Sequence, residues 1–496
     1  MKRNLLKSIA QCHLCGQPVH LLSNSAINML ESIIMNTIDQ MKLFMEPRSI
    51  AIIGVTRTTG MGSFNFMETV LSCGFTGQIY PVNPRADQIL GLNAYPGVNA
   101  IPEPVDLAVI ATPRDKVPPI VKECVEKGIK AIIVIAQGFA DADEEGKALQ
   151  AQIVEVAKKG GARIIGPNTF GVTNIFHSLS TTPAPLKMGR NSIGAISQSG
   201  FVFLGFPRFS FSKIIDLGNA CDIDLAEALT YFEDDPDIKV IVLHIEGIQT
   251  GRNFLQVANR VTRKKPVIAL KAGKSETGAR AVQSHSGSLV GKDDVYDAAF
   301  KQCGIIRASD AEEVEDLSLA FWRLPPMKGN RLAVMSWSGA IGVFTADACE
   351  RYGLELAKLS PVTVSRLRQL APPWLRISNP VDLWASIGLI LDPESFKERI
   401  KLVLEALLAE ENADAVIATI PDFTELLGEF GDISSLLPDV ADALEHRPLV
   451  FSVFGSQGKL TSKLEQSNKT VVFPSAERGV RALAGLWRYS HRLLNL

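Results

Sequence analysis

A single histidine stands among small residues in the stretch AVQSHSGSLVG, residues 281–291. His285 has no apolar side chain within two positions and no second metal ligand close to it, so a core or metal-bound histidine is not indicated. An imidazole can also be a covalent carrier of a phosphoryl group. Such a carrier needs room around one ring nitrogen, small neighbours, and donors for the phosphoryl oxygens. The run SHSGS meets the first two requirements, and we expect it to form a loop.

A carboxylate on the other ring nitrogen would fix the tautomer of such a histidine. Glu246 ends the apolar run KVIVLHIEG and could provide that carboxylate. His244 stands two residues earlier, on the same side of a regular strand, and we expect it to pack near the end of the sheet.

Two Ser-x-Ser-Gly turns could supply the donors for phosphoryl oxygens. Each follows an apolar run, and each is expected to begin a helix whose free N–H groups and dipole favour an anion. The openings GAISQSGFV and AVMSWSGAIG form a weak internal repeat. The residues concerned are Ser197, Ser199 and Gly200 in the first turn, and Ser336, Ser338 and Gly339 in the second.

Three other motifs do not carry the chemistry that they suggest. AGKS, residues 272–275, resembles the end of a phosphate-binding P-loop, but the first glycine of that motif would fall at Ile268, inside a strand. Neither Ser-x-Ser-Gly turn has the first glycine of the G-x-S-x-G motif of serine hydrolases. Cys12, His13 and Cys15 have half of a zinc-site spacing, and no second pair follows. We therefore expect no metal bound by this chain.

A glycine-rich loop follows the apolar run SIAIIG. Gly54, Gly60 and Gly62 have the spacing G-x5-G-x-G, which differs from the G-x-G-x-x-G of NAD-binding proteins. After the next strand stand Asn83 and Arg85, where an NAD-binding protein would have an acidic residue. A cation at this position suits a phosphorylated ribose such as that of CoA or NADP. The alternative is an ordinary turn with a surface arginine.

These residues follow short apolar runs that alternate with helical patterns. Continuous β-branched runs of this kind predict parallel strands covered on both faces, in which ligands bind beyond the carboxyl ends. We therefore predict a doubly wound α/β protein. The predicted strands lie within SIAIIG, DLAVIATP, KAIIVIAQG, RIIGPN, IGAISQSG, KVIVLHIEG, PVIALKAG, RLAVMSWSG, DAVIATIP and PLVFSVFG, and helix-rich stretches cover 396–412 and 434–446.

The length of 496 residues predicts several domains. The Pro-containing links STTPAPLKMGRNS and LPPMKGN separate three modules, 45–178, 179–325 and 326–496, after an N-terminal extension, 1–44, that we expect to be disordered or loosely docked. A net charge of −2 with no basic run argues against nucleic-acid binding. The chain has no apolar run long enough to span a membrane. Seven scattered cysteines favour reduced thiols in a cytoplasm.

The first module is similar to a known CoA-binding module. YPVNPR, DLAVIATP, AIIVIAQGF and IIGPNTFGV resemble the corresponding segments of succinyl-CoA synthetase α-subunits and NDP-forming acyl-CoA synthetases, and the resemblance extends from about residue 45 onward. It implies a Rossmann-like CoA-binding domain followed by two flavodoxin-like doubly wound domains. It also implies that CoA is bound by Thr56, Gly60, Gly62, Asn83, Arg85, Ala111, Thr112, Pro113, Gly138 and Asn168. Thr169 stands where many relatives have cysteine, a residue that is not their nucleophile.

The second module is similar to the phospho-histidine domain of the same family. SHSGSLVG and HIEG resemble the segments that hold the phosphorylated histidine and its orienting glutamate, which implies these roles for His285 and Glu246. In that family two helices point their N-termini at the phospho-histidine, and the two Ser-x-Ser-Gly turns match their starts. Gly218 and Asn219 in DLGNACDID are implied to line the site. The segment after the first turn is shorter than in relatives, and Trp337 stands where they often have small residues.

The resemblance also implies a partner. The family needs an ATP-grasp module to phosphorylate the histidine, and none is recognisable here, so the chain resembles an α-subunit of an α2β2 heterotetramer whose β-subunit binds ADP or ATP with Mg²⁺. The implied reaction converts acyl-CoA, phosphate and ADP to a small carboxylic acid, CoA and ATP, through an acyl phosphate and phospho-His285. The sequence leaves the acid open. A CoA-binding regulatory or scaffold protein without catalysis is the alternative, and an NAD(P)-dependent oxidoreductase does not fit the glycine spacing.

Overall fold

The computed structural model describes residues 36–60, 63, 65–182, 189–200, 205–286, 291–384, 393–422, 432–455 and 458–495, except the side chains of 283–286, 393–394 and 396. It divides into two compact units, which are described separately. Unit 1 contains Met1–Pro185 and Asp216–Asp235, and unit 2 contains Leu186–Ile215 and Pro236–Leu496. The predicted division into four domains, with its borders, remains a prediction.

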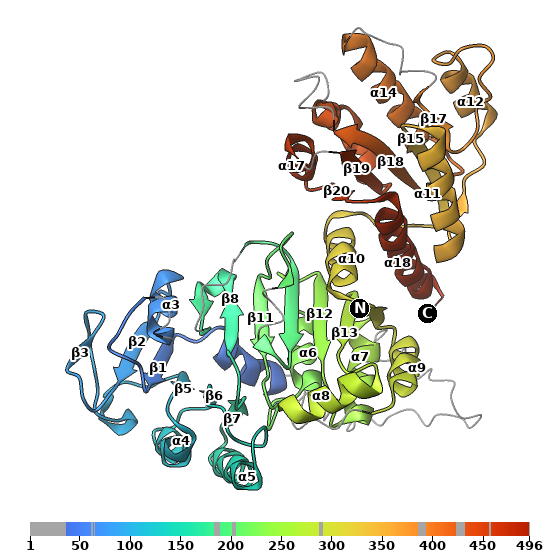
Figure 1. The fold of residues 1–496 in the computed structure, drawn as a ribbon. Coiled ribbons are helices and arrows are strands. Elements are labelled where there is room, and N and C mark those ends of the chain that lie inside the picture. Colours follow the sequence, from blue (N-terminus) through green and yellow to red (C-terminus); the bar gives the residue numbers. More distant parts are fainter. Residues whose placement is uncertain are drawn as a thin grey trace, which may run out of the picture. The chain divides into compact units, whose positions relative to one another are not determined.

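The sheet of unit 1 is parallel, with the strand order β2-β1-β5-β6-β7 (Figure 1). Its central strands β1, β5 and β6 are buried along their whole length, as expected of a sheet covered on both faces. The strands are β1 (Ser49–Ile53), β2 (Gln78–Val82), β5 (Leu107–Ile110), β6 (Ala131–Val134) and β7 (Arg163–Ile165), with short antiparallel pairs β3 (Gln88–Ile89) with β4 (Leu92–Asn93) and β8 (Val172–Asn174) with β9 (Leu179–Ser180).

Two helices of unit 1 illustrate how polar side chains cap helix starts. The Asn65 side chain caps α3, and Asp143 caps α5, whose first turn holds Glu144 and Glu145 and whose last turn holds lysines, as the helix dipole favours. The elements are α3 (Phe66–Ser72), α4 (Val117–Glu126), α5 (Glu144–Lys159), α6 (Leu225–Glu233), and the 3-10 turns η1 (Val98–Ala100), η2 (Arg114–Lys116) and η3 (Ile175–His177).

The end of the predicted extension belongs to the fold. Residues 36–45 are helical, and Met41, Phe44 and Met45 are completely buried. The main-chain oxygen of Met45 accepts a hydrogen bond of 3.0 Å from the Asn174 side chain. The expectation of a disordered or loosely docked segment is therefore wrong for residues 36–44, because Met41 and Phe44 are completely buried there. Residues 1–35, with Cys12 and Cys15, lie outside the described part of the chain.

Unit 2 contains two further sheets. The first has the order β11-β10-β12-β13-β14. Its elements are β10 (Ile193–Ser197), β11 (Lys213–Asp216), β12 (Val240–Ile245), α7 (Gly251–Val261), β13 (Val267–Lys271), α8 (Glu276–Ser286), α9 (Asp293–Cys303), β14 (Ile306–Ala308) and α10 (Ala311–Arg323).

The second sheet of unit 2 has the order β16-β15-β18-β19-β20, with β17 also paired to β15. Its elements are β15 (Arg331–Ser336), α11 (Gly339–Tyr352), β16 (Glu355–Leu356), α12 (Pro361–Arg368), β17 (Val381–Asp382), α14 (Pro393–Leu408), β18 (Ala415–Asp422), η6 (Ile433–Leu436), η7 (Pro438–Val440), α16 (Ala441–Leu444), β19 (Leu449–Gly455), α17 (Lys459–Glu465), β20 (Thr470–Phe473) and α18 (Ala476–Leu494).

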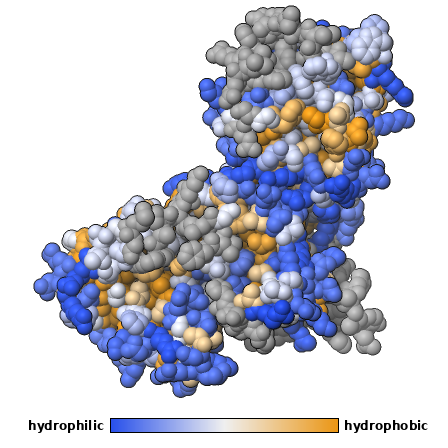
Figure 2. Space-filling view, viewed as in Figure 1, coloured by the Kyte–Doolittle hydropathy of each residue, from blue (hydrophilic) through white to orange (hydrophobic). Residues whose placement is uncertain are grey.

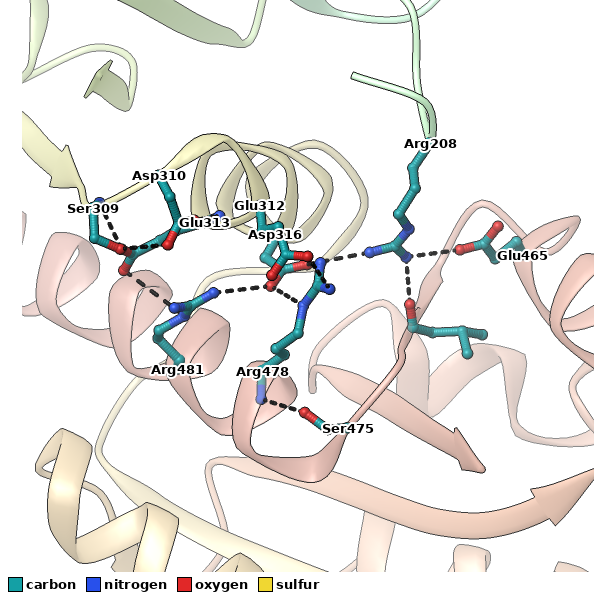
Figure 3. A network of polar contacts seen from close by, with 11 residues as sticks. Arg208, Ser309, Asp310, Glu312, Glu313, Asp316, Glu465, Ser475, Arg478 and Arg481 are labelled. Carbon is teal, nitrogen blue, oxygen red and sulfur yellow. Dashed lines mark hydrogen bonds and ion pairs between the residues drawn. The ribbon is translucent and has the colours of Figure 1, made fainter. Parts of the chain in front are cut away.

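These two sheets share one hydrophobic core cluster, which takes residues from both sheets and from the helices α10 and α18. A charged network reinforces the same junction (Figure 3). The carboxylate of Asp316 on α10 is fully buried and binds three guanidinium groups, those of Arg208, Arg478 and Arg481. Arg208 also binds Glu465 at 3.0 Å. The surface over α10 and α18 is correspondingly hydrophilic in Figure 2, whereas hydrophobic residues gather over α11.

The structure confirms the predicted α/β class. Every predicted strand is found, and β1, β10 and β15 each lie between the next strand in sequence and a later one, as in doubly wound sheets. The predicted helical stretch 396–412 overlaps α14, whereas 434–446 contains only short helical pieces. None of the described helices is long and apolar enough to cross a membrane.

Candidate functional site

The CoA residues expected in unit 1 gather at one edge of its sheet, because each follows the carboxyl end of a parallel strand. In this strand order the ligand crevice lies between the first strand and the third, here β1 and β5. Gly54 shows how closely these two chain segments approach. Its φ is +83°, and a Cβ at this position would lie 2.6 Å from Thr112 Cγ2 and 2.8 Å from the Ala111 oxygen. Only glycine fits there without displacing the turn of Ala111, Thr112 and Pro113.

The glycine-rich loop after β1 is held by side chains of its own. Asn65 donates to the main-chain oxygens of Thr56 (3.1 Å) and Thr58 (3.0 Å), and the Thr56 hydroxyl lies 2.8 Å from that of Thr58. The N–H of Gly60 donates to the Glu68 carboxylate at 3.0 Å. These bonds form the loop without a ligand. Gly62 lies outside the described residues.

Asn83 and Arg85 follow β2 beside this loop. The Asn83 side chain donates to the main-chain oxygen of Val55 at 3.0 Å, and its oxygen accepts the N–H of Arg85 at 2.8 Å. Asn83 therefore joins the two turns, while the Arg85 side chain is exposed. An exposed guanidinium at the edge of this crevice is suited to a phosphate group.

The turn after β5 has an unsatisfied polar atom. The Thr112 hydroxyl is buried and has no hydrogen-bond partner among the described residues. A buried hydroxyl without a partner costs free energy, so a ligand with a polar group is favoured here. Arg114, which the sequence reasoning missed, follows Pro113 and donates to the Gly138 oxygen at 2.7 Å and to Asp143 at 2.9 Å. The N–H of Gly146 and the Arg114 guanidinium lower the pKa of Asp143.

Asn168 lies at the same edge, in a left-handed backbone conformation with φ of +59°. Its side chain donates to that of Asn219 at 3.5 Å, and Asn219 donates to Asp141 at 2.8 Å. The neighbouring Gly218 packs against the main chain of Asn168, 2.4 Å from a Cβ position. Gly218 and Asn219 were expected to line the histidine site, and their described contacts are with residues of unit 1, among them the CoA candidate Asn168.

Thr169 is a buried residue that packs after β7. Its hydroxyl donates to the main-chain oxygen of Asp216 and accepts the N–H of Gly171 at 2.8 Å. Since both partners are main-chain groups, this threonine fixes the chain after β7.

In unit 2, Ser197 ends β10 and is completely buried. Its hydroxyl donates to the Ser199 oxygen at 2.7 Å and accepts the N–H of Ser199 at 3.0 Å. The same hydroxyl lies 3.1 Å from Nδ1 of His244, which is its register partner on β12. Burial and the nearby Lys271 lower the pKa of His244 to about 4, so the imidazole is neutral at pH 7.

Glu246 lies directly after β12, and both its main-chain N–H and its main-chain oxygen are hydrogen-bonded. Its N–H donates to the Gln198 side chain at 2.7 Å, and its main-chain oxygen accepts from Lys271 Nζ at 2.9 Å. The Lys271 ammonium is itself buried and stands 4.6 Å above the ring of Tyr296. In contrast, the carboxylate oxygen Oε2 of Glu246 is buried and has no partner among the described residues. A buried carboxylate oxygen requires a donor.

The second Ser-x-Ser-Gly turn follows β15 and begins α11, as predicted. Ser336 is completely buried and donates to the Ser338 oxygen at 2.7 Å, the same bond as in the first turn. Ser338 caps the helix, and Gly339 lies close to Asp382, whose Oδ2 would be 3.0 Å from a Cβ there. Trp337 meets Trp384 edge to face, with ring centres 6.4 Å apart. Trp337 thus packs beside the turn.

One expectation about this site is wrong. His285 lies in the last turn of α8 and not in a loop, because Glu276, Ala279 and the residues that follow continue the helix to Ser286. Its side chain lies outside the described residues. Three phenylalanines, Phe206, Phe209 and Phe211, pack on one another after the first turn. Gly200 in that turn is 3-10 helical, and the rest of the expected helix would fall on residues 201–204. Residues 201–204 are not described.

The sequence reasoning missed Gln198 and Lys271, which fix the peptide group of Glu246. Both contacts join residues far apart in the chain, and only strand register brings them together. A signal was present for Lys271, since a lysine ends an otherwise apolar strand.

Comparisons with known proteins match this arrangement. Residues 48–175 match the family described as CoA binding domain, and residues 190–321 match the family described as succinyl-CoA ligase like flavodoxin domain. The chain is 40% identical over 388 residues to the ADP-forming acetate–CoA ligase II subunit alpha of Pyrococcus furiosus, covering 77% of this chain and 82% of the relative.

Two longer matches cover most of the chain. It is 34% identical to the ADP-forming acetate–CoA ligase II of Archaeoglobus fulgidus, over 92% of this chain and 68% of that protein. A solved structure of acetyl-coenzyme A synthetase 1 from Candidatus Korarchaeum cryptofilum, in complex with phosphate and ADP, has a TM-score of 0.82 and 30% identity, with coverage of 92% of this chain and 98% of that one.

Proposed function

Since this chain belongs to the family of ADP-forming acetate–CoA ligases, which are acid–thiol ligases, we propose that it is the α-subunit of an acyl-CoA synthetase that carries phosphate on His285. It interconverts acyl-CoA, phosphate and ADP with a small carboxylic acid, CoA and ATP. The nucleotide and its Mg²⁺ are bound by an ATP-grasp β-subunit, in an α2β2 assembly.

The observation that carries this proposal is the buried Oε2 of Glu246 without a hydrogen-bond donor. The main chain of Glu246 is fixed by Gln198 and Lys271, so the carboxylate has a set direction. An imidazole N–H is the donor that such an oxygen needs, and it would leave the other ring nitrogen of His285 free to carry phosphate. His285 comes from α8, which follows β13, the register neighbour of β12.

Unit 1 supplies the CoA site in this proposal. The loop of Thr56, Gly60 and Gly62 would hold the nucleotide end, and Arg85 with Asn83 the ribose phosphate. The turn of Ala111, Thr112 and Pro113 would contact the arm of CoA, together with Gly138 and Asn168. The unpaired Thr112 hydroxyl and the ligand crevice between β1 and β5 support this assignment.

The reaction has three steps. Phosphate attacks the thioester carbon, a C–O bond forms, and the C–S bond breaks to give acyl phosphate and the CoA thiolate, which takes up a proton. The free ring nitrogen of His285 then attacks phosphorus, and the carboxylic acid leaves as its carboxylate. ADP finally accepts the phosphoryl group from nitrogen. Throughout, Glu246 orients the imidazole and stabilises its positive charge, and the turns at Ser197–Gly200 and Ser336–Gly339 bind phosphoryl oxygens.

The same family supports the proposed partner. The related Pyrococcus protein is named a subunit alpha, and the Archaeoglobus relative is longer than this chain, which covers 68% of it. A separate β-subunit would provide the remaining part. The five described cysteines are free thiols, which supports a reducing cytoplasm.

A CoA-binding regulatory or scaffold protein is the second candidate. It is favoured by one observation, the packing of Trp337 against Trp384 beside the second turn. Two indole rings there would narrow access to the N-terminus of α11.

The experiment is to incubate the chain with acetyl-CoA and ³²P-phosphate, with and without a β-subunit of the family. The enzyme predicts an acid-labile, alkali-stable label that His285→Ala abolishes and that Glu246→Gln reduces by about 100-fold. Asp310→Asn, a surface variant far from these residues in sequence, is the control. Tight CoA binding without label in either mixture would contradict the enzyme and support the regulatory protein.

A further inference from the structure

The two Ser-x-Ser-Gly turns have the same internal hydrogen bond. In each turn the first serine is completely buried at the end of a central strand, β10 or β15. Its hydroxyl donates to the main-chain oxygen of the second serine at 2.7 Å, from Ser197 to Ser199 and from Ser336 to Ser338. The two turns that resemble each other in sequence therefore also share the same hydrogen-bonded structure.

A side chain on the neighbouring strand completes each turn. His244 is the register partner of Ser197, with Nδ1 at 3.1 Å from its hydroxyl oxygen. Thr419 is the register partner of Ser336 and donates to its hydroxyl oxygen at 3.2 Å, with the Met335 oxygen at 3.4 Å as a second acceptor. His244 and Thr419 thus hold equivalent places in two different sheets.

The hydrogen-bond inventory determines the direction of the contact at His244. A serine hydroxyl has one proton, and that of Ser197 goes to the Ser199 oxygen. The remaining contact must therefore be donated by the imidazole, which makes His244 the Nδ1–H tautomer. Both buried partners, histidine and threonine, consequently act as donors to the first serine of a turn.

The surroundings of His244 keep it in this neutral form. Its side chain is 7% exposed, and the charged group that acts on it is the ammonium of Lys271. Burial first, and then this positive charge, lower its pKa to about 4. A histidine that stays neutral from pH 5 upward is a fixed donor and does not serve as an acid–base group in that range.

We infer that His244 and Thr419 are positioning residues, which hold the two Ser-x-Ser-Gly turns in the form that binds phosphoryl oxygens. They act through Ser197 and Ser336 and need not touch the substrate. This inference rests on the proposed function for the role of the turns, whereas the bonding that it assigns to His244 stands without it.

The chain itself suggests the matched variants. His244→Thr gives the first turn a threonine hydroxyl as donor, as Thr419 is in the second turn. His244→Leu removes the donor to Ser197. In the second turn, Thr419→Ser keeps the hydroxyl and Thr419→Val removes it at nearly constant volume. We expect the two variants without a donor to raise the KM for phosphate by about tenfold, with the KM for CoA unchanged. The two conservative variants should restore most of the affinity for phosphate.

The readouts separate positioning from other roles. A pH profile for His244→Thr that matches wild type between pH 6 and 8 supports positioning, and a profile that loses a basic or acidic limb overturns it. Equal losses for the variants with and without the donor also overturn it. If a loss came from unfolding alone, the apparent kcat would fall with both KM values unchanged, and this result counts against the inference.

A measurement without turnover tests the bonding directly. In the full chain labelled with ¹⁵N-histidine, the resonances absent from His244→Thr belong to His244. We expect a neutral Nδ1–H tautomer at pH 7. A neutral Nε2–H tautomer or a doubly protonated ring overturns the inference. If wild type takes no label from ³²P-phosphate, the proposed function fails, and the nitrogen shifts still decide whether His244 holds the turn.

Discussion

Replacing Asp316 by asparagine should weaken the junction between the two sheets of unit 2. Asp316 is completely buried on α10, and its two oxygens accept from three arginines. The distances are 3.2 Å to Arg208, 2.7 Å to both Nε and Nη2 of Arg478, and 3.3 Å to Arg481. Asparagine has nearly the same volume, but it removes the charge and turns one acceptor into a donor that faces guanidinium N–H groups.

The size of the effect follows from burial. Removing one partner from a buried ion pair leaves uncompensated charge and costs about 3–5 kcal/mol. Glu312 provides the matched control, because it faces the same Arg478 at 3.6 Å but its side chain is 70% exposed. An exposed pair of this kind contributes less than about 1 kcal/mol. We therefore expect Asp316→Asn to lower the free energy of unfolding by several times more than Glu312→Gln.

Tryptophan fluorescence during urea unfolding is the assay. All five tryptophans lie between residues 322 and 487, so the signal reports on unit 2 alone. Trp322 is on α10 and Trp487 on α18, the two helices that the network joins. If the two variants lose the same free energy within about 1 kcal/mol, the buried network contributes no more than an exposed ion pair, and the reasoning is refuted.

Three further results are expected. Gly54→Ala should weaken CoA binding and lower the free energy of unfolding by more than about 1 kcal/mol, because the added Cβ would meet the chain after β5. Gly91→Ala is the control, since Gly91 has a φ of +79° but open space around it, so alanine there adds only backbone strain. Calorimetric titration with CoA and melting temperatures compare the two variants. His244 has a pKa of about 4 in the fold against about 6.5 when unfolded, so the unfolded chain binds more protons between these values. The stability that neutral His244 contributes is therefore present above pH 6.5 and is lost as the pH falls. The free energy of unfolding should drop by about 2 kcal/mol between pH 7 and pH 5. In urea unfolding, His244→Thr should not show this drop. Lys271→Met removes the donor to the main-chain oxygen of Glu246 and should slow ³²P labelling of the chain about tenfold without changing CoA affinity in equilibrium dialysis.

The sheets were predictable from the sequence because their strands are continuous apolar runs. KVIVLHIEG and RLAVMSWSG cannot be solvated on either face, so each must lie inside a covered sheet. Parallel strands align their carboxyl ends, and the candidate residues after those ends therefore gather at shared edges. This rule predicted that Glu246 lies at the carboxyl end of β12.

The details of the site were less predictable. Serine and glycine around His285 indicated a loop, but the helix formers that precede it carry α8 through this position. The donors to Glu246 come from Gln198, 48 residues earlier, and Lys271, 25 residues later, and no local pattern reveals such pairs. The tautomer of His244 likewise required the register of β10 against β12.

The charged junction of unit 2 also sets an order of events during synthesis. Arg208 precedes Asp316 by 108 residues, and Arg478 follows it by 162. At the usual 5–20 residues per second, a ribosome needs roughly 8–30 s to reach Arg478 after Asp316. During that interval the nascent chain already holds Arg208 and the strands around Glu246. The half of unit 2 that bears the histidine can therefore fold first, and the later half is locked onto it when α18 emerges.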